Sequence, residues 1–278
     1  MTQYYQDIDF GHFNYELSPL YDVSDVVVRG PLPDRDKPFI AFVGAAQTFG
    51  RFCERPFPTI LAQRTGIPAL NLGLGGCGPR TFMQPKILDI LNDAQCVVLQ
   101  VLSGRSESNS KFKVGHGGTD VLGTRVSDEV VMRAEEFFVD FAQANAPAAV
   151  NHLIAENCAS YLEKYKLLFD SIKPKTILHW FARHTPEPTP HNILDGSLFG
   201  YFPHWIDRSM IEEMQNHCDA YVETVSNEGW PQQLWQAGES IDGGQLQDGY
   251  LYNYYYPSPE MHRQAAADLE YSMKRLFT

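Results

Sequence analysis

Two turns in this sequence have the composition of an anion-binding site. Gln47 and Thr48 follow the apolar run 39–43, at the expected start of a helix. Backbone N–H groups in the first turn of a helix lack partners within the helix, and the helix dipole favours negative charge there. Gly75 and Gly76 follow a second apolar run and let a ligand approach the backbone closely. We assign Gln47 to catalysis and the other three to substrate binding.

An arginine follows a third apolar run, 96–102, and small polar residues surround it. Arg105 is followed by Ser106 and, a few positions later, by Asn109. A guanidinium presents its N–H groups in a planar fork that matches a phosphate or a sulfate. We therefore assign Arg105 to catalysis, as the residue that binds the anionic reacting group. We assign Ser106 and Asn109 to substrate binding. Arg183, after a fourth apolar run, can reach the same substrate, and an exposed loop position is equally consistent with the sequence.

Other reactive side chains have simpler explanations. Cys77 lies in a glycine-rich turn and can replace a missing nucleophile, but no base is evident beside it and buried packing is favoured. His179 lies within an apolar run, which favours a core histidine. His184, Glu187 and His191 have potential ligand atoms, but their proline-rich spacing matches no specific metal-binding motif. No metal and no tightly bound cofactor is predicted.

The overall charge argues against nucleic acids and acidic membranes as partners. The 278 residues include 34 acidic and 22 basic side chains, which gives a net charge of −12. A small anionic or saccharide ligand remains compatible with this charge, because a local basic pocket is enough to hold it. The 14 tyrosines and 17 phenylalanines suit a pocket for sugars or nucleotides, although a core and an interface explain them more simply.

The cysteines and the N-terminus predict a cytoplasmic protein. The five cysteines are scattered and form no Cys-x-x-Cys pair, so neither zinc nor a disulfide framework is indicated. The N-terminus lacks the apolar core of a signal peptide. No apolar run approaches the roughly 18 residues of a membrane span. The oligomeric state is left open by these features.

Apolar runs and helical patterns alternate along most of the chain. This alternation predicts a three-layer α/β/α sandwich with a five-stranded parallel sheet in the flavodoxin-like order 2-1-3-4-5. The predicted strands cover residues 39–43, 67–72, 96–102, 176–181 and 220–225. The predicted helices cover residues 51–65, 85–91, 128–144, 149–172, 208–217 and 258–277. Because ligands bind at the carboxyl ends of such strands, Gln47, Gly75, Arg105 and Arg183 are expected at one edge.

One domain accounts for most of the sequence. Residues 1–36 are predicted as an irregular lead-in with a short edge strand at 26–28, and residues 37–278 as a single α/β domain. Three long loops are expected within that domain, at 104–127, 182–205 and 226–256. Loops of this length in a compact domain are often functional, so we expect them to cover the ligand.

Several segments resemble the conserved blocks of the SGNH/GDSL hydrolases. Residues 42–50 are similar to the first block, a strand followed by Gly-Asp-Ser-x-Thr-x-Gly. Residues 71–76 resemble the second block, Asn-x-Gly-x-x-Gly, and 96–106 occupy the place of the third. Residues 256–262 resemble the end of the last block. The resemblance spans about residues 38 to 276 and implies an SGNH-like fold with a pocket above strands 1 and 3.

The residues that such hydrolases use for catalysis are replaced here. The resemblance puts Ala46 at the nucleophilic serine, Asn253 at the orienting aspartate and Tyr256 at the general-base histidine. A serine esterase needs a hydroxyl, a base and a carboxylate within hydrogen-bond reach, so ester hydrolysis by this triad is not expected. The third-block asparagine is replaced by Arg105. His262 is a candidate base in a shifted register, and a histidine on a helix surface is the simpler explanation.

Three functions follow from these resemblances. The first is a divergent SGNH-like enzyme that transfers an acyl or similar group to or from a saccharide, with coenzyme A or another nucleotide-type donor. The start of the domain, Gly44-Ala45-Ala46-Gln47, is similar to that of capsule-polysaccharide acetyltransferase-like proteins, and also to an uncharacterised bacterial domain family. The second is a catalytically inactive protein that binds a small ligand. The third is a sulfotransferase-like enzyme that uses a sulfated nucleotide.

Overall fold

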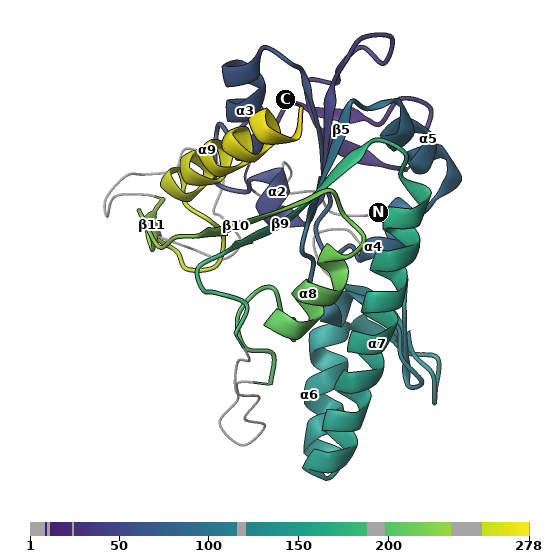
Figure 1. Cartoon of the computed structure of the whole chain (residues 1–278). Coiled ribbons are helices and arrows are strands. Elements are labelled where there is room, and N and C mark those ends of the chain that lie inside the picture. Colours follow the sequence, from purple (N-terminus) through teal and green to yellow (C-terminus); the bar gives the residue numbers. More distant parts are fainter. Residues whose placement is uncertain are drawn as a thin grey trace.

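A computed structural model of the chain describes residues 9, 12–23, 25–115, 121–187, 198–234 and 252–277. These residues form a mixed α/β fold, with a large, mostly parallel sheet in the centre and helices on both of its faces (Figure 1). The α/β class predicted from the sequence is therefore confirmed. The predicted loops at 182–205 and 226–256 lie partly outside the described residues.

Five strands of the sheet are parallel, and each overlaps an apolar run predicted as a strand. They are β3 (Ile40–Gly44), β4 (Ala69–Gly73), β5 (Cys96–Gln100), β9 (Lys175–Ala182) and β10 (Ala220–Val225). They lie side by side as β4-β3-β5-β9-β10, which is 2-1-3-4-5 when these five are counted in chain order. Because their carboxyl ends share one edge, the segments that follow β3, β5 and β9 begin at that edge.

The sheet has seven strands, so the prediction of a five-stranded sheet is wrong. β1 (Leu17–Pro19) and β2 (Val27–Arg29) extend it beyond β4 as antiparallel strands. Both lie in the lead-in 1–36, where β2 overlaps the strand predicted at 26–28 but lies between β1 and β4 and not at the edge, and where β1 was not predicted. The guanidinium of Arg29 is buried and donates a hydrogen bond to the backbone oxygen of Gly50 (2.9 Å). The lead-in thus fixes the turn that follows β3.

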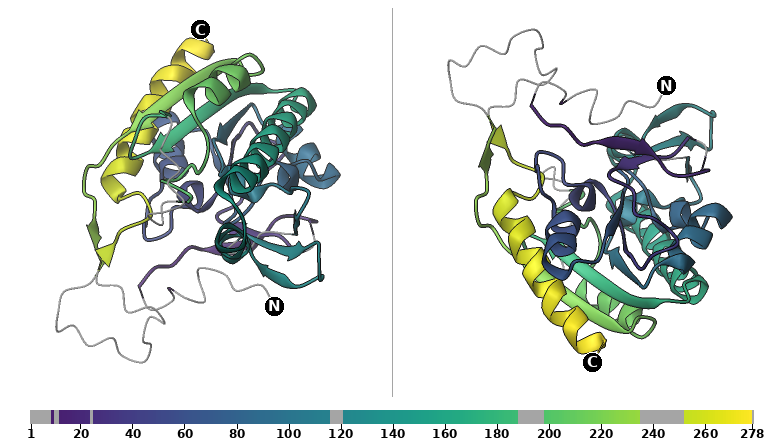
Figure 2. Two further views of the ribbon diagram at one scale, coloured as in Figure 1. Left: turned by 90° about the horizontal axis from the view of Figure 1, so that it is seen from below. Right: turned by 90° about the horizontal axis from the view of Figure 1, so that it is seen from above.

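Four of the parallel strands, β3, β4, β5 and β9, are buried on both faces along most of their length, which explains their largely apolar runs in the sequence, whereas β10 is only partly buried. On one face, side chains such as Phe42 and Ile177 pack against α3 (Phe57–Thr65) and α9 (Pro259–Leu276). On the other face, side chains such as Val43 pack against three helices. These are α5 (Pro85–Asp93), α7 (Pro147–Ser171) and α8 (Arg208–Gln215). Figure 2 shows α9 and α7 on opposite sides of the sheet.

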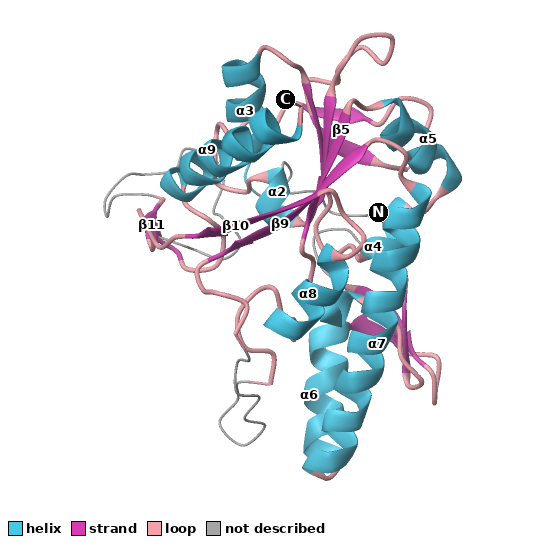
Figure 3. Ribbon diagram, in the orientation of Figure 1, coloured by secondary structure: helices cyan, strands magenta, loops and turns pink. Residues whose placement is uncertain are grey.

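Part of the predicted loop 104–127 belongs to a small antiparallel sheet. Its strands are β6 (Phe112–Val114), β7 (Leu122–Arg125) and β8 (Val131–Arg133). They pack with α6 (Ala134–Ala144) and the first half of α7 around a separate apolar cluster. This unit, which we call the arm (residues 107–115 and 121–160), extends away from the main sheet (Figure 3). The helix predicted at 128–144 starts later because β8 occupies its first residues.

The helix predicted at 51–65 begins only at Phe57, as α3. A separate short helix, α2 (Ala46–Phe49), precedes it and ends at Gly50, whose φ of 79° is left-handed. Pro58 lies in the first turn of α3 and Gly66 ends it, as predicted. Ser258 caps α9 as predicted, because its side-chain oxygen accepts a hydrogen bond from the backbone nitrogen of Met261 (3.2 Å). The remaining elements are α4 (Pro79–Phe82), the short 3-10 helix η1 (Gly104–Ser106), β11 (Gln232–Gln233) and β12 (Tyr252–Asn253).

All five cysteines are free thiols. Cys77 is buried and packs in the core, in agreement with the packing role that its surroundings favoured. Over the described ranges, no helix is both long enough and apolar enough to cross a membrane.

Candidate functional site

The turn after β3 is held rigidly by side chains from neighbouring strands. The Oε1 atom of Gln100, at the end of β5, accepts hydrogen bonds from the Ala45 backbone nitrogen (3.0 Å) and the Thr48 hydroxyl (2.7 Å). Asn71 of β4 donates to the backbone oxygen of Thr48 (3.0 Å). A Cβ atom at Gly44 would collide with the Thr48 hydroxyl. The Thr48 side chain therefore fastens α2 to the sheet, and it is fully buried there.

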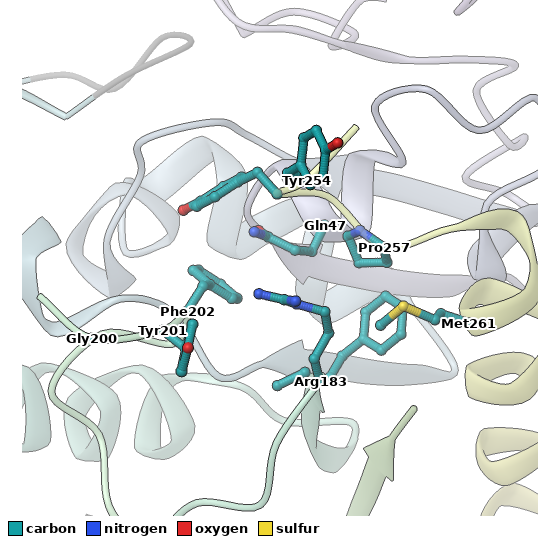
Figure 4. Close-up of a pocket in the computed structure, with 11 residues that line it drawn as sticks. Gln47, Arg183, Gly200, Tyr201, Phe202, Tyr254, Pro257 and Met261 are labelled. Carbon is teal, nitrogen blue, oxygen red and sulfur yellow. The ribbon is translucent and has the colours of Figure 1, made fainter. Parts of the chain in front are cut away.

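A pocket of about 240 Å³ lies beside Gln47 at the carboxyl edge of the sheet. Four segments form it: α2, the end of β9 with the next residue, the segment 200–202, and the stretch from 254 into α9 (Figure 4). We call it the Arg183 pocket. It is lined by Gln47, Phe181, Ala182, Arg183, Gly200, Tyr201, Phe202, Tyr254, Tyr255, Pro257 and Met261. Two residues predicted to act on a ligand, Gln47 and Arg183, are thus brought together.

Arg183 contacts two aromatic rings, and no carboxylate among the described residues pairs with it. The central carbon of its guanidinium lies 3.6 Å from the centre of the Trp230 ring and 5.5 Å from that of Tyr201. No ion pair joins Arg183 to a carboxylate in the described part of the chain. Burial lowers the pKa of Arg183. Both rings make cation–π contacts, and the guanidinium donates no hydrogen bond to a described residue, so its N–H groups remain available for an anion.

Gln47 supplies a second polar group to the same space. Its side chain is only 3% exposed, and its Oε1 atom accepts no hydrogen bond from any described residue. Figure 4 shows the Gln47 amide and the Arg183 guanidinium extending toward the same space. Because α2 is fixed by Gln100 and Asn71, the backbone that carries Gln47 is held in place before a ligand arrives.

A turn built by Asn253 carries two tyrosines into the wall of the pocket. The Oδ1 atom of Asn253 accepts hydrogen bonds from the backbone nitrogens of Tyr255 (3.0 Å) and Tyr256 (2.8 Å). Tyr254 and Tyr255 line the pocket. The Tyr256 hydroxyl instead accepts a hydrogen bond from Arg51 (3.3 Å). The amide of Asn253 therefore shapes the backbone and orients no histidine.

Arg105 lies away from the Arg183 pocket and packs against the arm. Its guanidinium is 3.8 Å from the carboxylate of Glu135 on α6 and 5.6 Å from the centre of the Phe199 ring. Ser106 is buried in η1. Asn109 accepts hydrogen bonds from the backbone of the next residues and donates one to Asn157 of α7 (2.8 Å). None of the three lines the pocket with Gln47, so the expected grouping of Gln47 with Arg105 is not observed there.

Gly75 and Gly76 form the turn that follows β4. Gly76 has a φ of 68°, in the left-handed region that favours glycine, and Gly75 is buried. Neither glycine is among the described residues that line the Arg183 pocket. The prediction that these glycines let a ligand approach the backbone therefore does not apply to that pocket.

His262 is a core residue, and its hydrogen bond argues against the predicted role as a base. Its Nδ1 atom accepts a hydrogen bond from the Phe57 backbone nitrogen (3.2 Å), so the ring proton is on Nε2. Burial, followed by the charges of Arg29 and His179, lowers its pKa to about 3. The lone pair that a base would use is therefore already occupied. His179 is likewise fully buried, as predicted for a core histidine.

A buried serine and histidine that the sequence did not reveal lie behind the pocket wall. Ser103, after β5, has its Oγ atom 2.8 Å from Nδ1 of His204. The Gly104 backbone nitrogen also donates to the His204 oxygen (3.0 Å). The His204 ring is 5.7 Å from the ring of Phe202, which lines the pocket. About a hundred residues separate the pair and no motif connects them, so only the folded chain brings them together.

The structure gives no support to a metal site at the loop after β9. His184 is hydrogen-bonded to the backbone, with Nε2 3.1 Å from the oxygen of Phe202. His191 lies outside the described residues. Within the ranges that are described, no group of three or more histidines, cysteines or acidic residues is arranged to hold a metal ion.

Comparisons with known proteins give distant matches. Residues 1–120 match the profile of a family described as a domain of unknown function (DUF6473). No curated protein matches the chain. Among solved structures, it is similar to a protein from Desulfitobacterium hafniense DCB-2 that is assigned to the lipolytic G-D-S-L family. That match has 14% identity and a TM-score of 0.36, and it covers 84% of this chain and 99% of the other.

Two further solved structures match at a similar level. The lipase Lip_vut3 from a goat rumen metagenome is 9% identical, with a TM-score of 0.43 and coverage of 85% of this chain and 97% of the lipase. A protein from Lactobacillus plantarum is 12% identical, with a TM-score of 0.38 and coverage of 86% and 97%. These identities and TM-scores are too low to assign an activity to this chain.

Proposed function

We propose that this chain is a protein of SGNH-like architecture that binds a small anionic ligand in the Arg183 pocket. The single observation that carries the proposal is the environment of Arg183, a cation in a pocket with stacked aromatic rings and no acidic partner among the described residues. Even partial burial of a charge without a carboxylate partner is unfavourable, so such a group favours an anion from solution. The Gln47 amide adds a neutral polar contact.

The residues near the pocket argue against ester hydrolysis by the usual triad. Ala46 has no hydroxyl, Asn253 holds a backbone turn, and the Tyr256 hydroxyl is hydrogen-bonded to Arg51. Nucleophilic catalysis needs a nucleophile with a base in reach. Of the two candidate functions at this pocket, ligand binding is therefore better supported than acyl transfer.

Thermal unfolding in the presence of simple anions tests the proposal. We expect acetate and sulfate to raise the melting temperature in a concentration-dependent way, because a ligand at about 100 times its Kd adds roughly 2.7 kcal/mol to the free energy of unfolding. Sodium chloride at equal ionic strength is the control for screening. Arg183→Met should abolish the increase, since it removes the charge and keeps a long apolar side chain.

Two further arginine variants make this test specific. Arg125→Met removes an exposed arginine paired with Asp128 and should leave the anion effect unchanged. Arg105→Met tests the site that the sequence favoured and should also leave it unchanged. The proposal is overturned if Arg183→Met retains the anion effect, or if Arg105→Met alone removes it.

Group transfer is the second candidate, and the Ser103–His204 pair is the observation that favours it. In such a reaction the Ser103 oxygen attacks an acyl carbonyl of a donor such as a coenzyme A thioester, and its proton passes to Nδ1 of His204. The leaving thiolate takes that proton, and the acyl group remains on Ser103 as an ester. An acceptor hydroxyl then attacks the ester carbonyl and gives its proton to His204, and the Ser103 oxygen leaves and takes that proton back. Burial and the nearby Arg105 hold the pKa of His204 well below its usual range. A negatively charged donor bound at Arg105 would raise the pKa of His204 again, because it would balance the charge of that arginine.

Labelling with a fluorophosphonate separates the two candidates. A serine activated by His204 should be labelled, and both Ser103→Ala and His204→Asn should abolish the labelling. Binding without group transfer predicts no labelling in any of the three proteins. The sulfotransferase alternative predicts that a sulfated nucleotide stabilises the chain in a manner that requires Arg105.

A further inference from the structure

The charges that line the Arg183 pocket limit the charge of its ligand. Of the described residues that line it, Arg183 alone is charged. One guanidinium balances one negative charge, whereas a phosphate group with two charges needs additional donors. The chain as a whole carries −12, which opposes a multiply charged ligand at long range. These features favour a single carboxylate or sulfate over a nucleotide.

The size of the pocket limits the ligand to about one ring. Its volume of about 240 Å³ is smaller than the 300–1,000 Å³ typical of pockets for drug-sized molecules. Trp230 and Tyr201 lie 3.6 and 5.5 Å from the guanidinium carbon of Arg183, so an anion competes least with these rings when it binds the N–H groups in the guanidinium plane. That direction allows two parallel hydrogen bonds to one carboxylate.

Exposed tyrosines line the pocket beside the arginine. Tyr254 is 61% exposed, Tyr201 is 59% exposed and Tyr255 is 45% exposed. An aromatic ring combines a flat apolar face with, in tyrosine, a hydroxyl that hydrogen-bonds at its edge. A sugar ring has the complementary surface, since its C–H groups form an apolar face and its hydroxyls form a polar edge. An aromatic acid would match the faces and leave the tyrosine hydroxyls and the Gln47 amide without ligand partners.

We infer that the ligand is a sugar acid, a single sugar ring that carries one carboxylate or sulfate. The acid group binds Arg183 in the guanidinium plane, and the ring packs against Tyr254, with its hydroxyls near Gln47. This inference rests on the proposed function and names the ligand class of the same pocket. A pocket whose polar groups bind a ligand's hydroxyls discriminates strongly against analogues that lack them.

Calorimetric titration with four matched compounds tests the ligand class. Glucuronate has the ring, the hydroxyls and one charge; cyclohexanecarboxylate lacks the hydroxyls; glucose lacks the charge; and glucose 6-phosphate has a second charge. We expect glucuronate to bind at least about tenfold more tightly than each of the others. The inference is overturned if cyclohexanecarboxylate or glucose 6-phosphate binds as tightly as glucuronate.

A tyrosine variant tests the position of the ring independently. Tyr254→Ala should weaken glucuronate binding up to about tenfold, or about 1.4 kcal/mol, because the sugar ring loses the aromatic face on which it packs. It should leave the effect of acetate unchanged, since acetate reaches only Arg183. Tyr252→Ala is the matched control, because Tyr252 is 38% exposed in β12 and does not line the pocket. Equal weakening by both variants would contradict stacking on Tyr254.

The same measurements distinguish failure of this inference from failure of the proposed function. If acetate stabilises the chain through Arg183 and glucuronate gains nothing over cyclohexanecarboxylate, only the sugar-acid inference fails. If neither acetate nor any of the four compounds binds, the anion-binding proposal fails with it.

Discussion

Two arginines near the carboxyl edge of the sheet have opposite surroundings. Arg51 makes two hydrogen bonds to the buried carboxylate of Asp9, each 3.0 Å long, and a third to the Tyr256 hydroxyl (3.3 Å). The Tyr15 hydroxyl donates to the same carboxylate (2.9 Å). Arg183 has stacked rings around it and no carboxylate among the described residues.

The difference separates a structural cation from one available to a ligand. Burial alone would lower the pKa of Arg51, but its hydrogen bonds to Asp9 and Tyr256 and their charges reverse this, and the pKa is raised. At Arg183 burial is the main effect, and the pKa is lowered. Arg51 therefore joins the N-terminal segment to the segment that carries the aromatic wall, whereas Arg183 retains N–H groups for an anion.

The largest effect that we predict comes from Arg51→Ala. It leaves the Asp9 carboxylate buried without its charged partner, so the free energy of unfolding should fall by roughly 3–5 kcal/mol. Urea denaturation monitored by circular dichroism measures this change. Arg125→Ala is the control, because it breaks an exposed ion pair with Asp128 and should cost less than about 1 kcal/mol. A loss at Arg51 no larger than the control would remove the contrast between the two arginines.

Glu107 is buried without full hydrogen bonding. We therefore expect it to have a smaller effect on the free energy of unfolding, one that depends on pH. It is 3% exposed, its Oε1 atom has no hydrogen-bond partner in the described residues, and burial raises its pKa to about 7. A raised pKa means that the folded state favours the protonated carboxyl. Its contribution to stability is therefore complete below about pH 4.5 and is lost as pH rises through 7.

Comparison of Glu107→Gln with the native chain between pH 5 and 8 measures this contribution. Relative to the variant, the native chain should lose up to roughly 3 kcal/mol of unfolding free energy as the pH rises. Glu136→Gln provides the control at an exposed glutamate. A native chain and a Glu107→Gln variant with parallel pH profiles would show that Glu107 titrates normally.

The parallel strands could be predicted because a strand that is buried on both faces is a continuous run of apolar residues in the sequence. Strands such as Ile40–Gly44 and Cys96–Gln100 are covered on both faces, so nearly every residue in them is apolar. β2 overlaps the strand predicted at 26–28, but β1 was missed, since its three residues, Leu-Ser-Pro, give little apolar signal. The strands of the arm have three or four residues each; β6 and β7 lie in the loop predicted at 104–127, and β8 lies in the helix predicted at 128–144.

The sequence predicted members of the candidate site only where a residue directly follows a strand, because the strand order then determines its place. Gln47 and Arg183 follow β3 and β9 directly, so the topology alone places them at one edge. Arg105 follows a neighbouring strand, but the position of its side chain depends on Glu135 and Phe199. Those contacts cross from the sheet to the arm and to the segment before His204, and no local pattern specifies them.

The smallest effect that we predict has the opposite sign to the first and concerns Arg183→Met. Methionine keeps a long flexible side chain against Trp230 and removes a partly buried charge that no described carboxylate balances. The free energy of unfolding without added anions should therefore stay the same or rise by up to about 1 kcal/mol. Urea denaturation of both variants in one chloride buffer measures the change in the free energy of unfolding for each. Arg51→Ala should lower it, and Arg183→Met should leave it unchanged or raise it. A residue that binds a ligand is often retained at some cost to stability. If Arg183→Met instead lowered the free energy of unfolding by several kcal/mol, Arg183 would be a structural cation like Arg51.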